Sequence, residues 1–137
     1  MGVWVVDASV ALKWFLTDGE ADAEQAMALL ADVASGTASM VQPPHFVAEV
    51  AAVLARFKPQ KARVDLRDLL EIEFEAVSSE AHYARALTLA IRYKHHLFDT
   101  LYHATALETA GAELVTADER YYTKARKEGR IRLLSSL

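Results

Sequence analysis

The sequence contains no cysteine, only three prolines and five glycines, and no apolar run long enough to span a membrane. Without cysteine the chain can form no disulfide, no thiolate metal site and no cysteine nucleophile. Its net charge of −4 argues mildly against a large nucleic-acid interface, because such interfaces carry a basic footprint. A small interface remains possible where metal ions reverse the charge of an acidic cleft. We expect a cytoplasmic protein with no membrane association.

The chain opens with a run that predicts a buried strand. Residues 3–6 read Val-Trp-Val-Val, and β-branched and aromatic residues favour strands. Because the run does not alternate with polar residues, it fits a parallel strand covered by helices on both faces. It ends in Asp7, at the carboxyl end of the strand, where open α/β sheets bind ligands. Aspartate is equally a preferred N-cap, here for a helix that begins near Ala8.

Helices and strands alternate along the rest of the chain. The pattern predicts helices over residues 8–16, 21–34, 45–57, 62–70, 79–93, 98–110 and 119–128. It predicts short strands at 38–41, 74–77, 113–116 and 131–134, and a turn at 17–20. This order is typical of a three-layer α/β/α fold with a central parallel sheet of about five strands. We expect a single domain over residues 1–137, in which the helices at 45–57 and 62–70 form a clip at one edge of the sheet.

Four of the 19 acidic residues stand where their carboxylates can meet. Asp7 and Asp118 each follow a predicted strand. Asp99 lies in an apolar stretch at a helix start, and Glu49 is a single acid in an otherwise apolar helical turn. An isolated buried carboxylate is costly unless it is paired, hydrogen-bonded or bound to metal. Crowded carboxylates repel one another, and hard cations such as Mg²⁺ or Mn²⁺ relieve this repulsion, which indicates phosphoryl chemistry.

These positions also have purely structural interpretations. His96 and His103 lie three residues before and four residues after Asp99, so either could form a structural pair with it. Glu49 could project from an exposed helix face. The adjacent histidines His95 and His96 stand on a connecting segment, where such residues more often face solvent than bind metal.

Polar and basic residues near the acidic positions are candidates for supporting roles. Ser9 and Thr116 each lie two positions from an aspartate, so each could hydrogen-bond a carboxylate, a phosphate or a metal-bound water. Capping or strand-end hydrogen bonding is the structural alternative. We hypothesise that the basic final quarter contacts RNA phosphates, whereas a solvated helix face is the alternative. It contains Arg120, Lys124, Arg126, Lys127, Arg130 and Arg132.

Three segments of the sequence are similar to a known family. They are residues 5–10, residues 98–102 with small residues after them, and residues 114–120. In these segments the sequence resembles the PIN-domain family, and within it the VapC-type ribonuclease toxins of toxin–antitoxin pairs. The four acidic positions of the family pattern are filled by Asp7, Glu49, Asp99 and Asp118. His103 departs from the pattern, because an apolar residue is expected there.

The resemblance implies a five-stranded parallel sheet and Mg²⁺- or Mn²⁺-dependent hydrolysis of RNA phosphodiesters by a metal-activated water. Asp7, Asp99 and Asp118 would be metal ligands. Glu49 would hold a metal, directly or through water, or orient the nucleophile, and Thr116 would support Asp118. The resemblance also implies a homodimer or a toxin–antitoxin hetero-oligomer, silenced by a cognate antitoxin whose tail enters the acidic cleft.

Two other functions fit parts of the pattern. A phosphatase could use an aspartyl nucleophile at the end of the first strand. Such sites often place a second aspartate two residues later, where this chain has Ser9. A catalytically silent binding module could keep the fold without turnover, although the filled acidic set argues against that loss.

Overall fold

The structure is a computed structural model that describes residues 2–16, 19 and 21–137, so the turn predicted at 17–20 falls mostly outside the described residues. The strands are β1 (Gly2–Val6), β2 (Ala38–Gln42), β3 (Glu75–Ala76), β4 (Ala112–Thr116) and β5 (Ile131–Leu133). The α-helices are α1 (Ala8–Ala11), α2 (Ala23–Ala34), α3 (Phe46–Phe57), α4 (Ala62–Glu71), α5 (Glu80–Tyr93), α6 (Leu97–Leu107) and α7 (Glu119–Ala125). Short 3₁₀ helices are η1 (Leu12–Trp14), η2 (Arg126–Glu128) and η3 (Leu134–Ser136).

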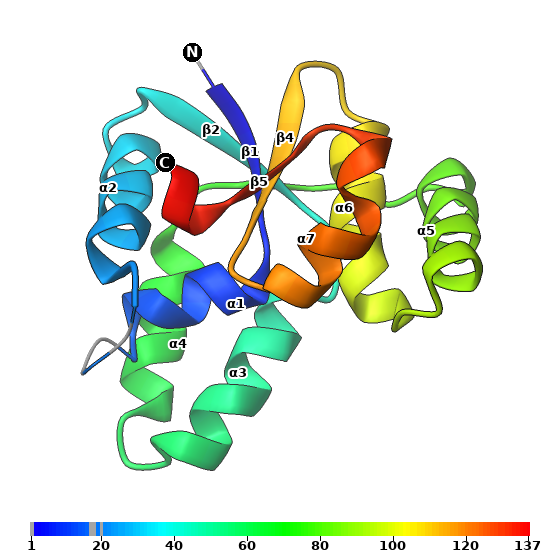
Figure 1. Cartoon of the computed structure of the whole chain (residues 1–137). Coiled ribbons are helices and arrows are strands. Elements are labelled where there is room, and N and C mark those ends of the chain that lie inside the picture. Colours follow the sequence, from blue (N-terminus) through cyan, green and yellow to red (C-terminus); the bar gives the residue numbers. More distant parts are fainter. Residues whose placement is uncertain (1, 17–18, 20) are drawn as a thin grey trace.

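The five strands form one parallel sheet in the order β3-β2-β1-β4-β5, with β1 at its centre. Helix α2 packs against β2 on one side of the sheet and α6 packs against β4 and β1 on the other, with α5 outside α6 (Figure 1). Helices connect each strand to the next, as parallel strands require. These features confirm the predicted three-layer α/β/α fold.

The second half of strand β1 is buried as its apolar run predicts, whereas Val3 and Trp4 are half-buried. Val5 and Val6 are fully buried, and Val6 lies opposite Val115 of β4. On its other side the buried side chain of Gln42 continues the pairing. The Val6 amide donates to Gln42 Oε1 at 2.7 Å, and Gln42 Nε2 donates to the Val6 carbonyl at 2.8 Å. Hydrogen bonds therefore pair the backbone of β1 on both edges of the strand as far as Val6, the residue before Asp7.

Several predicted elements are shorter in the structure. The helix predicted at 8–16 consists of α1 followed by η1, and the helix predicted at 119–128 changes to η2 at Arg126. Strand β3 contains only two residues, both exposed, because it is an edge strand paired only with β2. None of the helices in the described part of the chain combines the length and hydropathy needed to cross a membrane.

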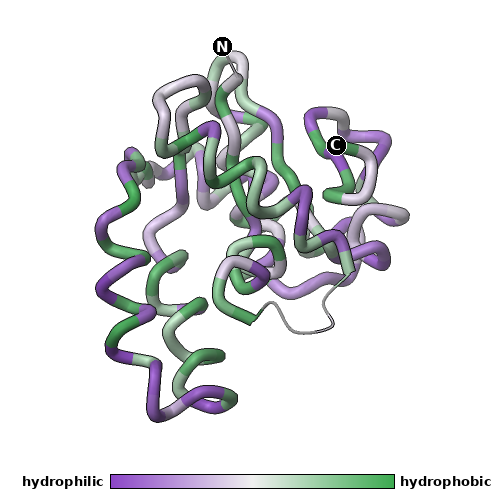
Figure 2. The backbone as a smooth tube through the Cα atoms, turned by 90° about the vertical axis from the view of Figure 1, so that its left-hand side faces the viewer, coloured by the Kyte–Doolittle hydropathy of each residue, from purple (hydrophilic) through white to green (hydrophobic). Residues whose placement is uncertain are grey.

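Helices α3 and α4 form the predicted helical pair, which projects beyond the carboxyl ends of the central strands (Figure 1). The tip of the pair is hydrophilic (Figure 2). The connection between α3 and α4, at this tip, is tied to the domain by Lys58, which donates to the Phe15 carbonyl at 2.8 Å and lies 3.1 Å from the buried Asp65 carboxylate. These contacts hold the far end of α3 against the segment that follows η1.

Candidate active site

Four acidic side chains surround one cavity at the carboxyl ends of the central strands. Asp7 follows β1, Asp118 follows β4, and the other two come from α3 and from the first turn of α6. The parallel register places the ends of β1 and β4 side by side, where the Asp7 amide donates to the Val115 carbonyl at 3.0 Å. The cavity has a volume of about 240 Å³ and is lined by Asp7, Ala8, Ser9, Leu12, Glu49, Val53, Asp99 and Asp118.

The Asp7 carboxylate belongs to this cavity and does not cap α1. Asp7 occupies the N-cap position, but its side chain makes no capping hydrogen bond. Instead Oδ2 accepts hydrogen bonds from the hydroxyl of Ser9 and, at 3.1 Å, from that of Thr116. The structural interpretation of Asp7 as a capping residue is therefore wrong.

Burial dominates the electrostatics of Asp7. Burial, together with the negative charges of Asp99 and Glu49, raises the pKa of the carboxyl from 3.8 to about 7. The hydrogen bonds from Ser9 and Thr116 act in the opposite direction and only partly compensate. A cation bound beside Asp7 would favour its ionised form.

Ser9 and Thr116 join the ends of β1 and β4 on both sides of Asp7. Thr116 Oγ1 donates to Asp7 and accepts from the Asp118 amide at 3.0 Å, while Ser9 Oγ accepts from the Ala117 amide at 3.1 Å. The Asp118 side chain caps α7, because its Oδ1 accepts from the Tyr121 amide at 3.0 Å. One compact set of hydrogen bonds thus fixes two of the four carboxylates.

Glu49 faces the cavity, so the interpretation that it projects from an exposed face is wrong. Its Oε1 accepts a hydrogen bond from the Tyr102 hydroxyl at 2.8 Å. Burial raises the pKa of Glu49, and the Tyr102 hydrogen bond counteracts part of this effect. Burial and the negative charge of Glu49 in turn raise the pKa of Tyr102, which keeps the phenol a hydrogen-bond donor.

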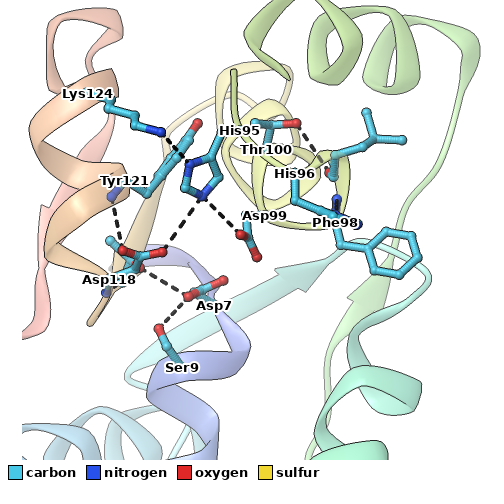
Figure 3. A network of polar contacts seen from close by, with 12 residues as sticks. Asp7, Ser9, His95, His96, Phe98, Asp99, Thr100, Asp118, Tyr121 and Lys124 are labelled. Carbon is cyan, nitrogen blue, oxygen red and sulfur yellow. Dashed lines mark hydrogen bonds and ion pairs between the residues drawn. The ribbon is translucent and has the colours of Figure 1, made fainter. Parts of the chain in front are cut away.

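The partner of Asp99 is a histidine that the sequence analysis placed in solvent. The His95 side chain is only 11% exposed, and its Nε2 lies 3.0 Å from Asp99 Oδ2 and 3.8 Å from Asp118 Oδ2 (Figure 3). The expectation of a solvent-facing His95 is therefore wrong. His96 is exposed and does not pair with Asp99, because its Nδ1 accepts from the Phe98 amide at 3.0 Å and caps α6.

The end of α5 explains how His95 reaches Asp99. Lys94 ends this helix in the left-handed conformation, with φ of 50°. Such a residue commonly terminates a helix, but it is usually glycine. The signal in the sequence was the four-residue spacing between His95 and Asp99. That spacing is helical, but α6 begins only at Leu97, so His95 and Asp99 do not lie on one helix.

His103 is the buried centre of a separate cluster and does not pair with Asp99. Its Nδ1 lies 2.8 Å from the Tyr121 hydroxyl, and its Nε2 lies 2.8 Å from the Gly129 carbonyl. Because a carbonyl can only accept, Nε2 carries the proton and Nδ1 accepts from the phenol. Burial lowers the pKa of His103. This side chain links α6 to the segment between α7 and β5.

The basic final quarter is largely engaged in contacts within the chain. Arg132 pairs with Glu113 at 3.1 Å, and Arg130 donates to the Thr109 carbonyl at 2.9 Å. Arg120 is exposed on α7 and, among the described residues, makes no hydrogen bond or ion pair with the four acids. The structure does not bring Arg120 into the acidic cluster.

The four carboxylates share an arrangement that suits a hard divalent cation. One oxygen of each carboxylate accepts a hydrogen bond from the protein, and the other accepts none within the described ranges. In addition, ligand atoms of His95, Asp99 and Asp118 lie within 4.8 Å of one another. Carboxylate oxygens that accept no hydrogen bond from the protein and meet at one cavity are the ligand atoms that Mg²⁺ and Mn²⁺ prefer.

Comparison with known families agrees with this geometry. The sequence model of the family described as PIN domain matches residues 4–127. The matched residues include all four acidic positions, the last three residues of β1, and β2, β3 and β4 in full. A comparison with curated proteins found no match.

Proposed function

Because this chain belongs to the PIN domain family, we propose that it is a metal-dependent endoribonuclease of the VapC toxin type, inhibited by a cognate antitoxin. PIN domains are generally Mg²⁺-dependent nucleases. The observation that carries the proposal is the convergence of four carboxylates on one cavity, each with one oxygen held by a hydrogen bond from the protein and the other accepting no hydrogen bond within the described ranges.

The residues present fit a bound Mg²⁺ or Mn²⁺. Asp7, Asp99 and Asp118 are the ligands we propose, because all three line the cavity with an oxygen to which no described residue donates. When bound, such a cation supplies an activated water and stabilises the charge that develops on a phosphate. The raised pKa of Asp7 means that metal binding and loss of its proton are coupled near neutral pH.

The other polar residues of the site hold these groups in position. Ser9 and Thr116 fix Asp7 Oδ2 and orient its second oxygen. The Tyr102 hydroxyl holds Glu49 Oε1, so Oε2 is free to accept a proton from an attacking water. The raised pKa of Glu49 favours this role, since a base works best when its pKa approaches the operating pH.

RNA and the antitoxin would both approach the same acidic cavity. RNA carries phosphates that need a cation there, whereas an antitoxin tail with a basic side chain would pair with the carboxylates directly. We therefore propose that metal-bound substrate and antitoxin compete for this site. The homodimer and the toxin–antitoxin assembly are proposed from the family resemblance alone.

Cleavage of a mixed RNA pool by the purified protein tests the proposal. With Mg²⁺ or Mn²⁺ we expect cutting that EDTA abolishes and that Asp7→Asn lowers by about 100-fold or more, because a metal ligand is lost. Asp68→Asn is the matched control, since Asp68 is an exposed carboxylate on α4 outside the cavity. We expect it to cut like the parent protein.

Three outcomes would contradict the proposal in different ways. A folded protein that binds Mn²⁺ at the acids but cuts no RNA would favour the silent binding module. Release of phosphate from small monoesters, lost in Asp7→Asn, would favour the phosphatase, although Ser9 stands where its second aspartate is expected. A folded protein that binds no Mn²⁺ would refute the shared metal site.

A further inference from the structure

A chain of polar contacts leads from α7 to the acidic residues of the cavity (Figure 3). Lys124 Nζ, on α7, lies 3.2 Å from His95 Nδ1, and His95 Nε2 lies 3.0 Å from Asp99 Oδ2. The imidazole packs against the Tyr121 ring at a centroid distance of 4.8 Å. His95 is thus held on three sides, and its orientation is set by residues of α7 and α6.

Lys124 determines which nitrogen of His95 carries the proton. A lysine ammonium group has three donors and no acceptor. Its hydrogen bond to Nδ1 therefore needs the lone pair of that nitrogen, which leaves the ring proton on Nε2. Nε2 then donates to Asp99 Oδ2, where the 3.0 Å separation is that of an ordinary hydrogen bond.

With the proton on Nε2, the imidazole has the opposite tautomer from the one it would need to bind a metal through Nε2. A metal-bound imidazole donates the N–H of its other nitrogen to a carboxylate, a carbonyl or a water. In this chain the other nitrogen faces a donor, Lys124, so Nε2 has no lone pair to offer. His95 lies within 4.8 Å of two metal-binding carboxylates but is not arranged as a third ligand.

We propose that His95 is a positioning residue that donates to Asp99, and that Lys124 prevents it from ligating the metal. The inference rests on the proposed metal site. Its consequence is a site with oxygen ligands only, in which Asp99 Oδ2 is held and Oδ1 is free. Donors to ligating carboxylates typically change metal affinity by 10- to 100-fold.

The proton position can be measured without any metal. Nitrogen NMR of the histidine side chains at a pH where His95 is neutral should show the Nε2–H tautomer in the parent protein. In Lys124→Met the Nδ1–H tautomer should become populated, while Lys127→Met, a nearby charge-matched control on η2, should leave the spectrum of His95 unchanged. An Nδ1–H tautomer in the parent protein would overturn the proposal, as would an unchanged tautomer in Lys124→Met.

Mn²⁺ affinity, measured by titration calorimetry, tests the positioning role. We expect His95→Leu to weaken Mn²⁺ binding by about tenfold. His95→Gln should stay within about threefold of the parent protein, because its amide N–H replaces the Nε2 donor. The control is His96→Asn, which changes the neighbouring exposed histidine and keeps a capping side chain. Equal affinity in His95→Leu and the parent protein would overturn the positioning role.

Electron spin-echo spectroscopy of bound Mn²⁺ separates the two roles of the imidazole. We expect no histidine nitrogen coupling in the parent protein and a coupling in Lys124→Met, where Nε2 gains a lone pair. Nitrogen coupling in the parent protein would show that His95 is a ligand and would refute the inference. A protein that binds no Mn²⁺ would refute the proposed metal site instead, and the NMR result would still decide the tautomer.

Discussion

Two polar regions lie side by side in this domain and differ in how completely their groups are paired. Around His103 both ring nitrogens have partners, the Tyr121 hydroxyl and the Gly129 carbonyl. Around the acidic cavity each carboxylate has one paired oxygen and one for which no described residue provides a donor. The first region is arranged like a core, whereas the second is arranged to receive a ligand.

Tyr121 connects the two regions. Its amide donates to the Asp118 carboxylate, which caps α7, its hydroxyl donates to His103, and its ring packs on His95. Burial and neighbouring negative charges raise its pKa, so the phenol stays a donor. The fully paired region therefore supports the half-paired one, and removing the Asp7 charge should have the opposite effect on stability from removing the His103 imidazole.

The largest expected effect is a gain in stability when Asp7 is neutralised. The pKa of Asp7 is about 7 in the folded protein and near 3.8 in the unfolded chain, so the unfolded chain loses its proton first as pH rises. Metal-free stability should therefore fall between about pH 4 and pH 7, by about 4 kcal/mol in total from this group. Asp7→Asn should remove this loss.

Denaturant unfolding at pH 4 and pH 8 measures the effect. We expect Asp7→Asn to match the parent protein at pH 4 and to be more stable at pH 8, both in EDTA. Asp68→Asn serves again as the exposed control. If Asp7→Asn were destabilised equally at both pH values, the carboxyl would be a structural group like those around His103, and the comparison would fail.

The next effect is a loss of stability in the paired region. His103→Leu keeps a similar volume but leaves the buried Tyr121 hydroxyl and the Gly129 carbonyl without a partner. We expect unfolding to become easier by about 3 kcal/mol, since each orphaned buried group costs about 1–3 kcal/mol.

A double variant sharpens this result. Tyr121→Phe removes the orphaned hydroxyl, so His103→Leu combined with Tyr121→Phe should recover about 1 kcal/mol of the loss. Thermal and denaturant unfolding of both single variants and the double variant give the coupling. Purely additive effects would show that the two side chains do not act as a pair.

The smallest expected effect concerns the hydrogen bond that holds Glu49. Tyr102→Phe removes the donor to Oε1 and should cost about 1 kcal/mol of stability. The same bond lowers the pKa of Glu49, so its loss should raise that pKa further. Carbon NMR titration of the Glu49 carboxyl checks the direction, with Tyr83→Phe on the exposed face of α5 as control. An unchanged pKa of Glu49 in Tyr102→Phe would show that the Tyr102 hydroxyl does not influence this carboxylate.

Much of the fold was predictable because it follows from local patterns. The apolar run of β1, the periodicity of the helices and the alternation of elements predict a parallel sheet with helices on both faces. The ends of parallel strands meet at one edge, so the meeting of Asp7 and Asp118 could be predicted as well. The strand predicted at 74–77 is present but shorter, because only Glu75 and Ala76 pair with β2.

The partners of the acids were less predictable. His95 was assigned to solvent and His103 was considered a partner of Asp99, and the structure reverses both. The reversal depends on the left-handed conformation of Lys94 and on the position of Leu97 as the first residue of α6. A side chain just outside a helix changes direction with a single backbone angle, and no periodicity records that angle.

By itself, the sequence determined the order of the elements, the burial of β1 and the placement of acidic residues at strand and helix ends. These are consequences of residue type and spacing, which act over a few positions. Only the tertiary structure decided that Tyr102 holds Glu49 from another helix, that Lys124 fixes the His95 ring and that Arg120 stays outside the cluster. Such contacts join residues far apart in the chain, and packing sets their distances and hydrogen-bond polarity.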